Sequence, residues 1–212
     1  MNVFQTWLGI LRTPTQTFEE EMRTSTWQKG VFHWLLMLVL SFLYIVIAMS
    51  FAPESDAETL QSVFTPAVLG ATFLSSLVSN AGGALLATLV LFGCMRFAKG
   101  KGSLVQTFHI QMLLGSFASI FAVLVGFVLF GLAQATGGVI ASGDTSPVYV
   151  ILVFVLVAAL IIYSVGLYIK ALKALGQFST GRAISTIVYQ IILSFLLSLA
   201  LMAPLMALFF SL

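Results

Sequence analysis

The chain has 212 residues, of which 60% are hydrophobic and only 8% charged; its net charge is +2 and its mean hydropathy is +1.10. About a quarter of the residues in soluble domains are charged, so this composition excludes an ordinary soluble domain and predicts a protein of the lipid bilayer. With nine Lys and Arg residues and a single cysteine, Cys94, it also excludes a disordered chain, a nucleic-acid binder and a disulfide-stapled secreted module.

The N-terminal segment, residues 1–30, is predicted to be cytoplasmic and amphipathic. Its apolar residues recur at helical spacing, and Thr13-Pro14 predicts the start of a second short helix that carries Phe18 and Met22. Two interpretations stay open: the segment lies on the cytoplasmic leaflet, or it packs against the cytoplasmic ends of the membrane helices. The periodic residues of the first helix are Val3, Phe4, Trp7, Leu8 and Leu11.

Five apolar stretches that follow are long enough to cross about 30 Å of hydrocarbon, which takes roughly 20 helical residues. Barrel strands of roughly 10 residues would alternate apolar and polar positions, and these stretches do not. The sequence therefore predicts an all-α polytopic membrane protein, a bundle of five transmembrane helices with an N-terminal amphipathic segment. The predicted membrane domain covers residues 31–212, with spans at approximately 31–51, 66–95, 104–133, 148–169 and 183–212.

Three of these helices have marked starts. Thr65-Pro66 and Ser146-Pro147 each place a capping hydroxyl before a proline, and Ser103 with Gln106 resembles a capping box. The second, third and fifth stretches exceed the crossing length and should tilt, break or extend beyond the hydrocarbon, with break points predicted at Gly82-Gly83 and Pro204.

The distribution of charge predicts the orientation. Two loops between spans carry only acids, Glu54, Asp56 and Glu58 in one and Asp144 in the other. Because cytoplasmic segments retain Lys and Arg, the N-terminus is predicted to be cytoplasmic and, five crossings later, the C-terminus outside. All nine cations lie in the N-terminal segment and the two remaining loops: Arg12, Arg23, Lys29, Arg96, Lys99, Lys101, Lys170, Lys173 and Arg182.

Small residues recur every four positions along the second span and form one ridge. Lipid tails give no hydrophobic drive between helices, so spans associate through the close backbone approach that such ridges allow. This predicts a helix-packing face, with packing inside the chain favoured over a homodimer contact. The ridge consists of Ala71, Ser75, Ser79, Gly83 and Ala87, and a shorter ridge of Ala118, Ala122 and Gly126 on the third span could meet it.

Uncharged polar residues in the spans are candidates for a polar cavity open to the cytoplasm. An unpaired amide near the middle of a span costs a few kcal/mol, so Asn80 should point into the bundle. Interhelical hydrogen bonding or interfacial exposure is the favoured alternative for the whole set. No Cys or carboxylate stands at a ligand spacing from His109, so neither a metal nor a cofactor is predicted. The candidates are Asn80, Gln106, His109, Gln111 and Gln190.

The basic loops are predicted to contact lipid headgroups, each cation adding on the order of 1 kcal/mol against an anionic leaflet. Residues 99–103 superficially resemble a phosphate-binding loop, but such a loop would need glycine at Met95 and Ser or Thr at Gly102. The predicted headgroup contacts are Arg96, Lys99, Lys101, Lys170, Lys173 and Arg182.

No Asp, Glu, Lys or Arg falls inside a predicted span, whereas pumps and ion-coupled transporters use such groups. No nucleophile stands with a base in a recognisable motif, so no catalytic residue and no enzyme activity is predicted. The sequence leaves open a passive pathway or a groove for lipid.

Several segments carry a family resemblance: Pro14 and Phe18 in Thr-Pro-Thr-Gln-Thr-Phe, residues 100–108 before the third span, and residues 168–172 with 176–183 before the fifth. With this layout the chain resembles the Yip (Ypt-interacting protein) domain family in its short prokaryotic form. The resemblance implies a multi-span integral membrane protein and, in the eukaryotic branch, a partner of Rab-type GTPases. That partner is not carried over, because the longer eukaryotic N-terminal region is missing.

The expected function is that of a non-enzymatic membrane scaffold, organiser or assembly partner in the plasma (inner) membrane of a prokaryote. The alternative is a passive channel, or a transporter of lipids or small solutes, with a polar cavity open to the cytoplasm. The expected partners are membrane lipids and either another protein or a second copy of the chain, and no nucleic acid.

Overall fold

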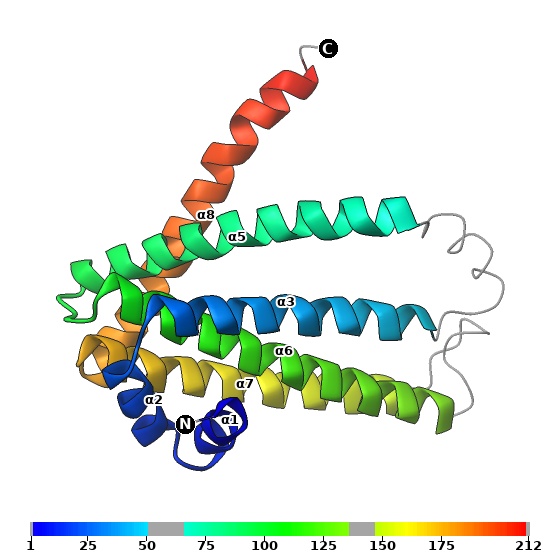
Figure 1. Cartoon of the computed structure of the whole chain (residues 1–212), viewed down its shortest axis with the longest axis horizontal. Coiled ribbons are helices and arrows are strands. Elements are labelled where there is room, and N and C mark those ends of the chain that lie inside the picture. The colour runs from blue at the N-terminus through cyan, green and yellow to red at the C-terminus, as the bar shows by residue number, and fades with distance from the viewer. Residues whose placement is uncertain (1, 51–65, 136–146, 211–212) are drawn as a thin grey trace. The chain divides into compact units, whose positions relative to one another are not determined.

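The structure is a computed structural model that describes residues 2–50, 66–135 and 147–210. Within these residues it contains seven helices and no strand (Figure 1), which confirms the all-α prediction. The helices are α1 (Val3–Arg12), α2 (Pro14–Arg23), α3 (Trp27–Ser50), α5 (Pro66–Phe97), α6 (Leu104–Ala135), α7 (Pro147–Gly176) and α8 (Thr180–Phe210).

Four of the described helices are long and apolar enough to cross a membrane, which makes the chain a polytopic helical membrane protein. The four do not include α3, which has 24 residues. The apolar parts lie in α5, α6, α7 and α8 and cover Phe73–Phe97, Leu104–Leu129, Val150–Gly176 and Thr180–Ala200.

The local signals place the helix starts correctly. Helices α5 and α7 begin at Pro66 and Pro147, while Thr65, Ser146 and the acidic residues of the two loops lie outside the described residues. The capping box of α6 is confirmed, because the Ser103 hydroxyl accepts from the Gln106 N–H (3.2 Å) and the Ser103 N–H donates to Gln106 Oε1 (2.9 Å).

The predicted helix breaks are wrong. Helix α5 continues through Gly82-Gly83, and α8 continues through Pro204, so the long stretches extend as single helices. A glycine inside a helix costs about 1 kcal/mol and a proline about 3 kcal/mol. Breaking a membrane helix would leave backbone N–H and C=O groups without partners in lipid, which costs more, so α5 and α8 stay helical at these positions.

The contacts divide the chain into two compact units. Unit 1 comprises Met1–Trp27, Gly83–Gln111 and Tyr168–Leu212, and unit 2 comprises Gln28–Gly82 and Met112–Leu167. Unit 1 therefore holds α1, α2, α8 and both of the loops that join α5 to α6 and α7 to α8. The boundary predicted at residue 30 stays a prediction.

The core of unit 1 lies where the C-terminal ends of α5 and α7 meet the start of α8. Side chains of α5 and α7 meet the start of α8 there, and Met22 of α2 packs against them, so the N-terminal segment contributes to this core. Its buried members are Leu91, Met95, Leu172, Leu175, Phe178 and Ala183.

Glycines bring the two loops of unit 1 into direct contact. The Lys101 N–H donates to the Gly176 carbonyl (3.2 Å), and a Cβ atom added at Gly102 would lie 2.6 Å from the carbonyl oxygen of Leu175. A Cβ atom at Gly100 or Gly176 would collide with the Phe178 ring. The two loop segments that carry the family resemblance therefore pack against each other.

In unit 2, α3 packs on α6 over glycines. A Cβ atom added at Gly115 would lie 2.8 Å from Met37 Sδ, and one at Gly126 would lie 2.7 Å from the Tyr44 ring. His33 Nδ1 lies 3.0 Å from the Ser116 hydroxyl, both buried, and joins the same two helices. Gly126, which belongs to the shorter ridge predicted on the third span, thus lies against α3, and contact of that ridge with the second span stays a prediction.

We expect Gly126→Leu to weaken this packing, because the added side chain must displace the Tyr44 ring. Overpacking of this kind costs about 1–3 kcal/mol, measurable as a lower melting temperature in detergent. The matched control is Gly131→Leu on the same helix, since a Cβ atom at Gly131 meets no atom within 4 Å in the part of the chain that the structure describes. Equal melting of the two variants would count against a close α3–α6 contact.

Candidate functional site

The N-terminal helices form a packed pair. Helix α1 begins with a capping box in which the Asn2 side chain accepts from the Gln5 N–H (2.8 Å). Ile10 of α1 and Phe18 of α2 are fully buried, and a Cβ atom at Gly9 would collide with Thr17. The two helices therefore share one buried face.

The outer side of α1 stays apolar and exposed. Phe4 is 66% exposed and Leu11 is 45% exposed, and their spacing places them on the same helical face. The segment packs against the other parts of unit 1 through one face, and its other face carries exposed apolar residues; contact of that face with the leaflet stays a prediction.

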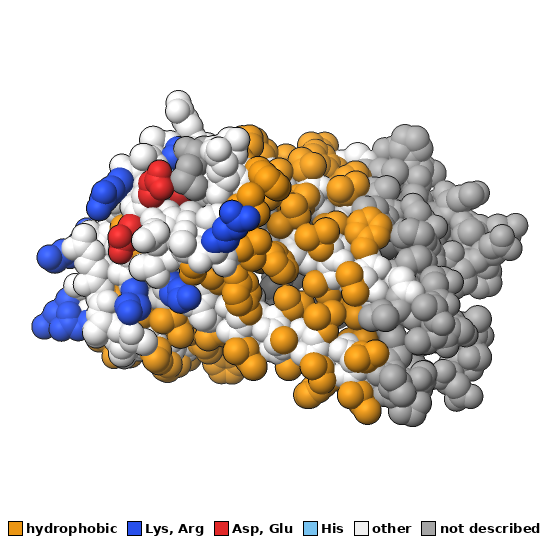
Figure 2. Space-filling model, turned by 90° about the horizontal axis from the view of Figure 1, so that it is seen from below, with side chains coloured by type: hydrophobic (Ala, Val, Ile, Leu, Met, Phe, Trp, Pro, Cys, Tyr) orange, Lys and Arg blue, Asp and Glu red, His pale blue; other side chains and the backbone are white. Residues whose placement is uncertain are grey.

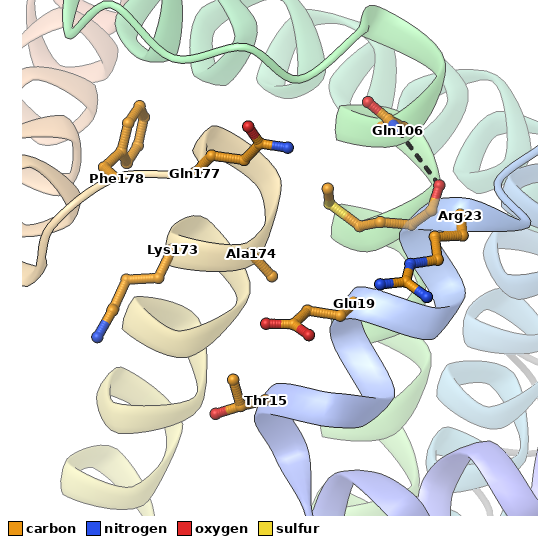
Figure 3. A pocket seen from close by; sticks show the side chains of 9 residues that line it. Thr15, Glu19, Arg23, Gln106, Lys173, Ala174, Gln177 and Phe178 are labelled. Atoms are coloured by element: carbon orange, nitrogen blue, oxygen red, sulfur yellow. Dashed lines mark hydrogen bonds between the residues drawn. The ribbon is translucent and has the colours of Figure 1, made fainter.

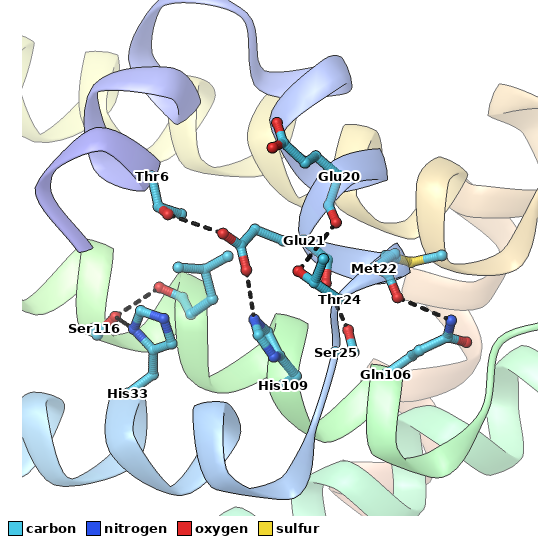
Figure 4. A network of polar contacts seen from close by, with 11 residues as sticks. Thr6, Glu20, Glu21, Met22, Thr24, Ser25, His33, Gln106, His109 and Ser116 are labelled. Carbon is cyan, nitrogen blue, oxygen red and sulfur yellow. Dashed lines mark hydrogen bonds and ion pairs between the residues drawn. The ribbon is translucent and has the colours of Figure 1, made fainter. Parts of the chain in front are cut away.

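The buried carboxylate of Glu21 connects α2 to α6. Glu21 is 4% exposed; its Oε1 atom accepts from the Thr6 hydroxyl (2.9 Å), and its Oε2 atom lies 3.2 Å from His109 Nε2 (Figure 4). His109 is fully buried. Buried charged groups are tolerated when they are paired in this way. The contacts of Glu21 thereby join α1, α2 and the first turns of α6.

A second contact reinforces this attachment. The Gln106 side-chain amide, which lies on the same face of α6 as His109, donates to the Met22 carbonyl (3.2 Å; Figure 4). Gln106 therefore caps its own helix through Oε1 and holds α2 through Nε2.

The structure brings together only part of the predicted polar set. Gln106 and His109 both face α2, whereas Gln190 accepts from the Tyr168 hydroxyl, which joins α7 to α8. Gln111 is partly buried, and its Oε1 atom has no hydrogen-bond partner among the described residues. Asn80 belongs to unit 2, is exposed, and donates to the carbonyl of Ser76 in its own helix (2.8 Å).

Glu21 was not among the site residues predicted from the sequence. Phe18 and Glu21 are three positions apart, so helical periodicity could have placed this glutamate at the edge of the apolar face of α2. Its partner could not be found in that way, because His109 is distant in the sequence.

The small-residue ridge of α5 is largely uncovered. Ala71, Ser75, Ser79 and Gly83 are exposed and Ala87 is partly buried. A Cβ atom added at Gly83 would meet none of the described atoms within 4 Å. The packing role of this ridge stays a prediction.

The six cations predicted to contact lipid headgroups are all exposed and all lie in unit 1. Eight of the nine Lys and Arg residues of the chain belong to this unit, and only Lys29 belongs to the other. In the space-filling view, Lys and Arg side chains gather in one region of the visible face (Figure 2).

Unit 1 also contains a pocket of about 560 Å³ between α2, the first turn of α6 and the end of α7 (Figure 3). Its exposed rim carries the charged side chains of Glu19, Arg23 and Lys173, while its floor is partly apolar. The lining residues are Thr15, Glu19, Met22, Arg23, Gln106, Lys173, Ala174, Gln177 and Phe178.

Within the described residues, no group of three or more His, Cys, Asp or Glu side chains could hold a metal ion.

The fold defines a multi-pass helical membrane protein with an N-terminal helical pair docked on its basic unit. The family comparison matches the Yip1 domain to residues 8–202, which is most of the chain, and the chain therefore belongs to the Yip1 domain family. This confirms the family resemblance found in the sequence. Neither the curated proteins nor the solved structures contain a match.

Proposed function

We propose that this Yip1 domain protein is a non-enzymatic membrane scaffold or organiser that works by assembling with other membrane helices. The observation that carries the proposal is the exposed ridge of α5, where Ser79 and Gly83 leave room for a second helix. Close approach over small residues is a main source of helix association in lipid. The partner on this ridge is either a second copy of the chain or another membrane protein.

The proposed topology has five spans, with α3 as the first. A helix of 24 residues is about 36 Å long and exceeds the roughly 30 Å of hydrocarbon. The concentration of cations in unit 1 supports a cytoplasmic N-terminus and an external C-terminus in a prokaryotic plasma membrane. The exposed Lys and Arg residues of unit 1 then contact lipid headgroups, and Phe4 and Leu11 of α1 contact the leaflet surface.

Leucine on the ridge tests this proposal. We expect Ser79→Leu and Gly83→Leu to lower the assembled fraction at least severalfold, because the larger side chain prevents close backbone approach. The measurement is native mass spectrometry of protein released from its own membrane with minimal detergent. Gly82→Leu is the matched control, since it makes the same change at the preceding position, where a Cβ atom also meets no described atom within 4 Å.

An assembled fraction that is the same in Gly83→Leu and Gly82→Leu would refute the role of the ridge. A monomer that carries solutes or lipids across proteoliposomes would replace the scaffold with the alternative function, a passive channel or transporter. The pocket in unit 1 is the observation that favours this alternative.

A further inference from the structure

The pocket beside α2 gathers charges of both signs around one opening. Arg23 and Glu19 lie on α2 and Lys173 lies on α7; the Glu19 carboxylate lies between the two cations, and the Lys173 ammonium points away from it (Figure 3). All three residues are exposed, and exposed long side chains change rotamer within nanoseconds, so these side chains can turn toward a bound molecule. Their charges are therefore available to a molecule that enters the pocket.

The two cations favour a phosphate group. A guanidinium and an ammonium are the side chains that bind phosphate oxygens most strongly, Arg through a planar pair of N–H donors and Lys as a point charge. A phosphate alone would leave the Glu19 carboxylate unpaired beside an anion. A ligand that also carries a primary ammonium group satisfies this carboxylate with a charge-assisted hydrogen bond.

The remaining lining fits such a zwitterion. Met22, Ala174 and Phe178 form the less exposed part of the pocket and can contact a short carbon linker. The volume of about 560 Å³ lies in the range of roughly 300–1,000 Å³ that is typical of small-molecule sites.

Gln177 also lines the pocket, and its backbone has an unusual conformation. Its φ is 53°, in the left-handed region that follows many helices and that glycine usually occupies. A non-glycine residue at this position carries a conformational cost, and here it places a side-chain amide toward the pocket (Figure 3). This amide can hydrogen-bond the phosphate oxygens.

We propose that this pocket binds a phosphoethanolamine group, with Arg23 and Lys173 on the phosphate and Glu19 on the ammonium. The group is supplied either by the headgroup of phosphatidylethanolamine or by a soluble phosphodiester of the same chemistry. This site goes beyond the scaffold function and does not depend on it, because none of its residues belongs to the α5 ridge.

Calorimetric titration of the full-length, delipidated protein in detergent tests the assignment. The probes are glycerophosphoethanolamine, glycerophosphocholine, glycerol phosphate and short-chain phosphatidylethanolamine below its micellar concentration. We expect the two ethanolamine compounds to bind, and the choline compound to bind at least about tenfold more weakly, because its quaternary nitrogen has no N–H donor for Glu19. Similar affinity for both ethanolamine compounds indicates recognition of the headgroup alone, whereas much tighter binding of the short-chain lipid indicates a membrane source.

Substitutions separate the two halves of the site. Arg23→Gln and Lys173→Gln should each weaken every phosphate probe by about tenfold, because each removes a charged hydrogen bond. Glu19→Gln should weaken glycerophosphoethanolamine and leave glycerol phosphate bound at least as tightly. The matched control is Glu20→Gln, which removes a carboxylate from the same helix as Glu19 outside the pocket lining and should bind like the wild type.

Two results would overturn the proposal: absence of binding of every probe to the wild-type protein, or an unchanged preference for ethanolamine over glycerol phosphate in Glu19→Gln. The changed residues are exposed, so unaltered melting temperatures verify that the variants are folded. The assembled fraction is measured on the same samples, which distinguishes failure of the pocket from failure of the scaffold function.

Discussion

Replacement of Glu21 by alanine will release α1 and α2 from α6. The substitution removes the acceptor of the Thr6 hydroxyl and the carboxylate beside His109 Nε2, and it leaves both partners in a buried environment. Removing one partner of a buried polar contact leaves the other unsatisfied, which costs about 1–3 kcal/mol for each group. Hydrogen exchange of residues 3–23 should therefore rise strongly, and limited proteolysis should cleave the segment 24–26 that follows α2.

The control for this variant is Glu20→Ala, because Glu20 is the exposed neighbour on the same helix. His109→Ala should have a similar effect, and the double variant Glu21→Ala/His109→Ala should lose less stability than the sum of the single variants. Unchanged exchange protection of α1 and α2 in Glu21→Ala would show that apolar contacts alone hold the segment.

The second large effect is expected at the contact between the two loops of unit 1. A Cβ atom at Gly102 would lie 2.6 Å from the Leu175 carbonyl oxygen, so Gly102→Val forces the two backbones apart. This also strains the hydrogen bond from the Lys101 N–H to Gly176. The expected cost is about 3 kcal/mol, which is a fall in melting temperature of roughly 10 °C for a chain of this length.

Gly181→Val provides the comparison for this loop. Gly181 lies in the first turn of α8, and a Cβ atom there meets no described residue within 4 Å, so the same substitution should be nearly neutral. Melting curves recorded by intrinsic fluorescence in one detergent measure both variants. If Gly102→Val and Gly181→Val have the same melting temperature, the two loops do not approach closely in the protein.

The sequence predicted the features that depend on neighbouring residues. Pro66 and Pro147 start helices because a first-turn proline loses no hydrogen bond, and Ser103 caps α6 because its partner Gln106 is three positions away. The attachment of α2 to α6 could not be predicted in this way. The residues that form it, such as Met22 and Gln106, are 84 positions apart, and no periodicity within either helix specifies the other.

Asn80 shows why the partner of a polar residue in a span is hard to predict. The sequence led to the expectation that its amide needs a partner on another helix. The amide of Asn80 instead donates to the carbonyl of Ser76, one turn earlier, so α5 itself satisfies part of its hydrogen-bonding capacity.

Helix α2 contributes both to the contact with α6 and to the wall of the pocket. Docking of the N-terminal helices and ligand binding in the pocket are therefore thermodynamically linked. Glu21 faces α6, while Glu19 and Arg23 form one wall of the pocket. A molecule that needs this wall binds only the docked conformation, so its apparent affinity falls in proportion to the docked fraction. Conversely, occupancy of the pocket shifts the N-terminal pair toward the docked state, and the exposed strip of Phe4 and Leu11 is then held at a fixed place on the unit.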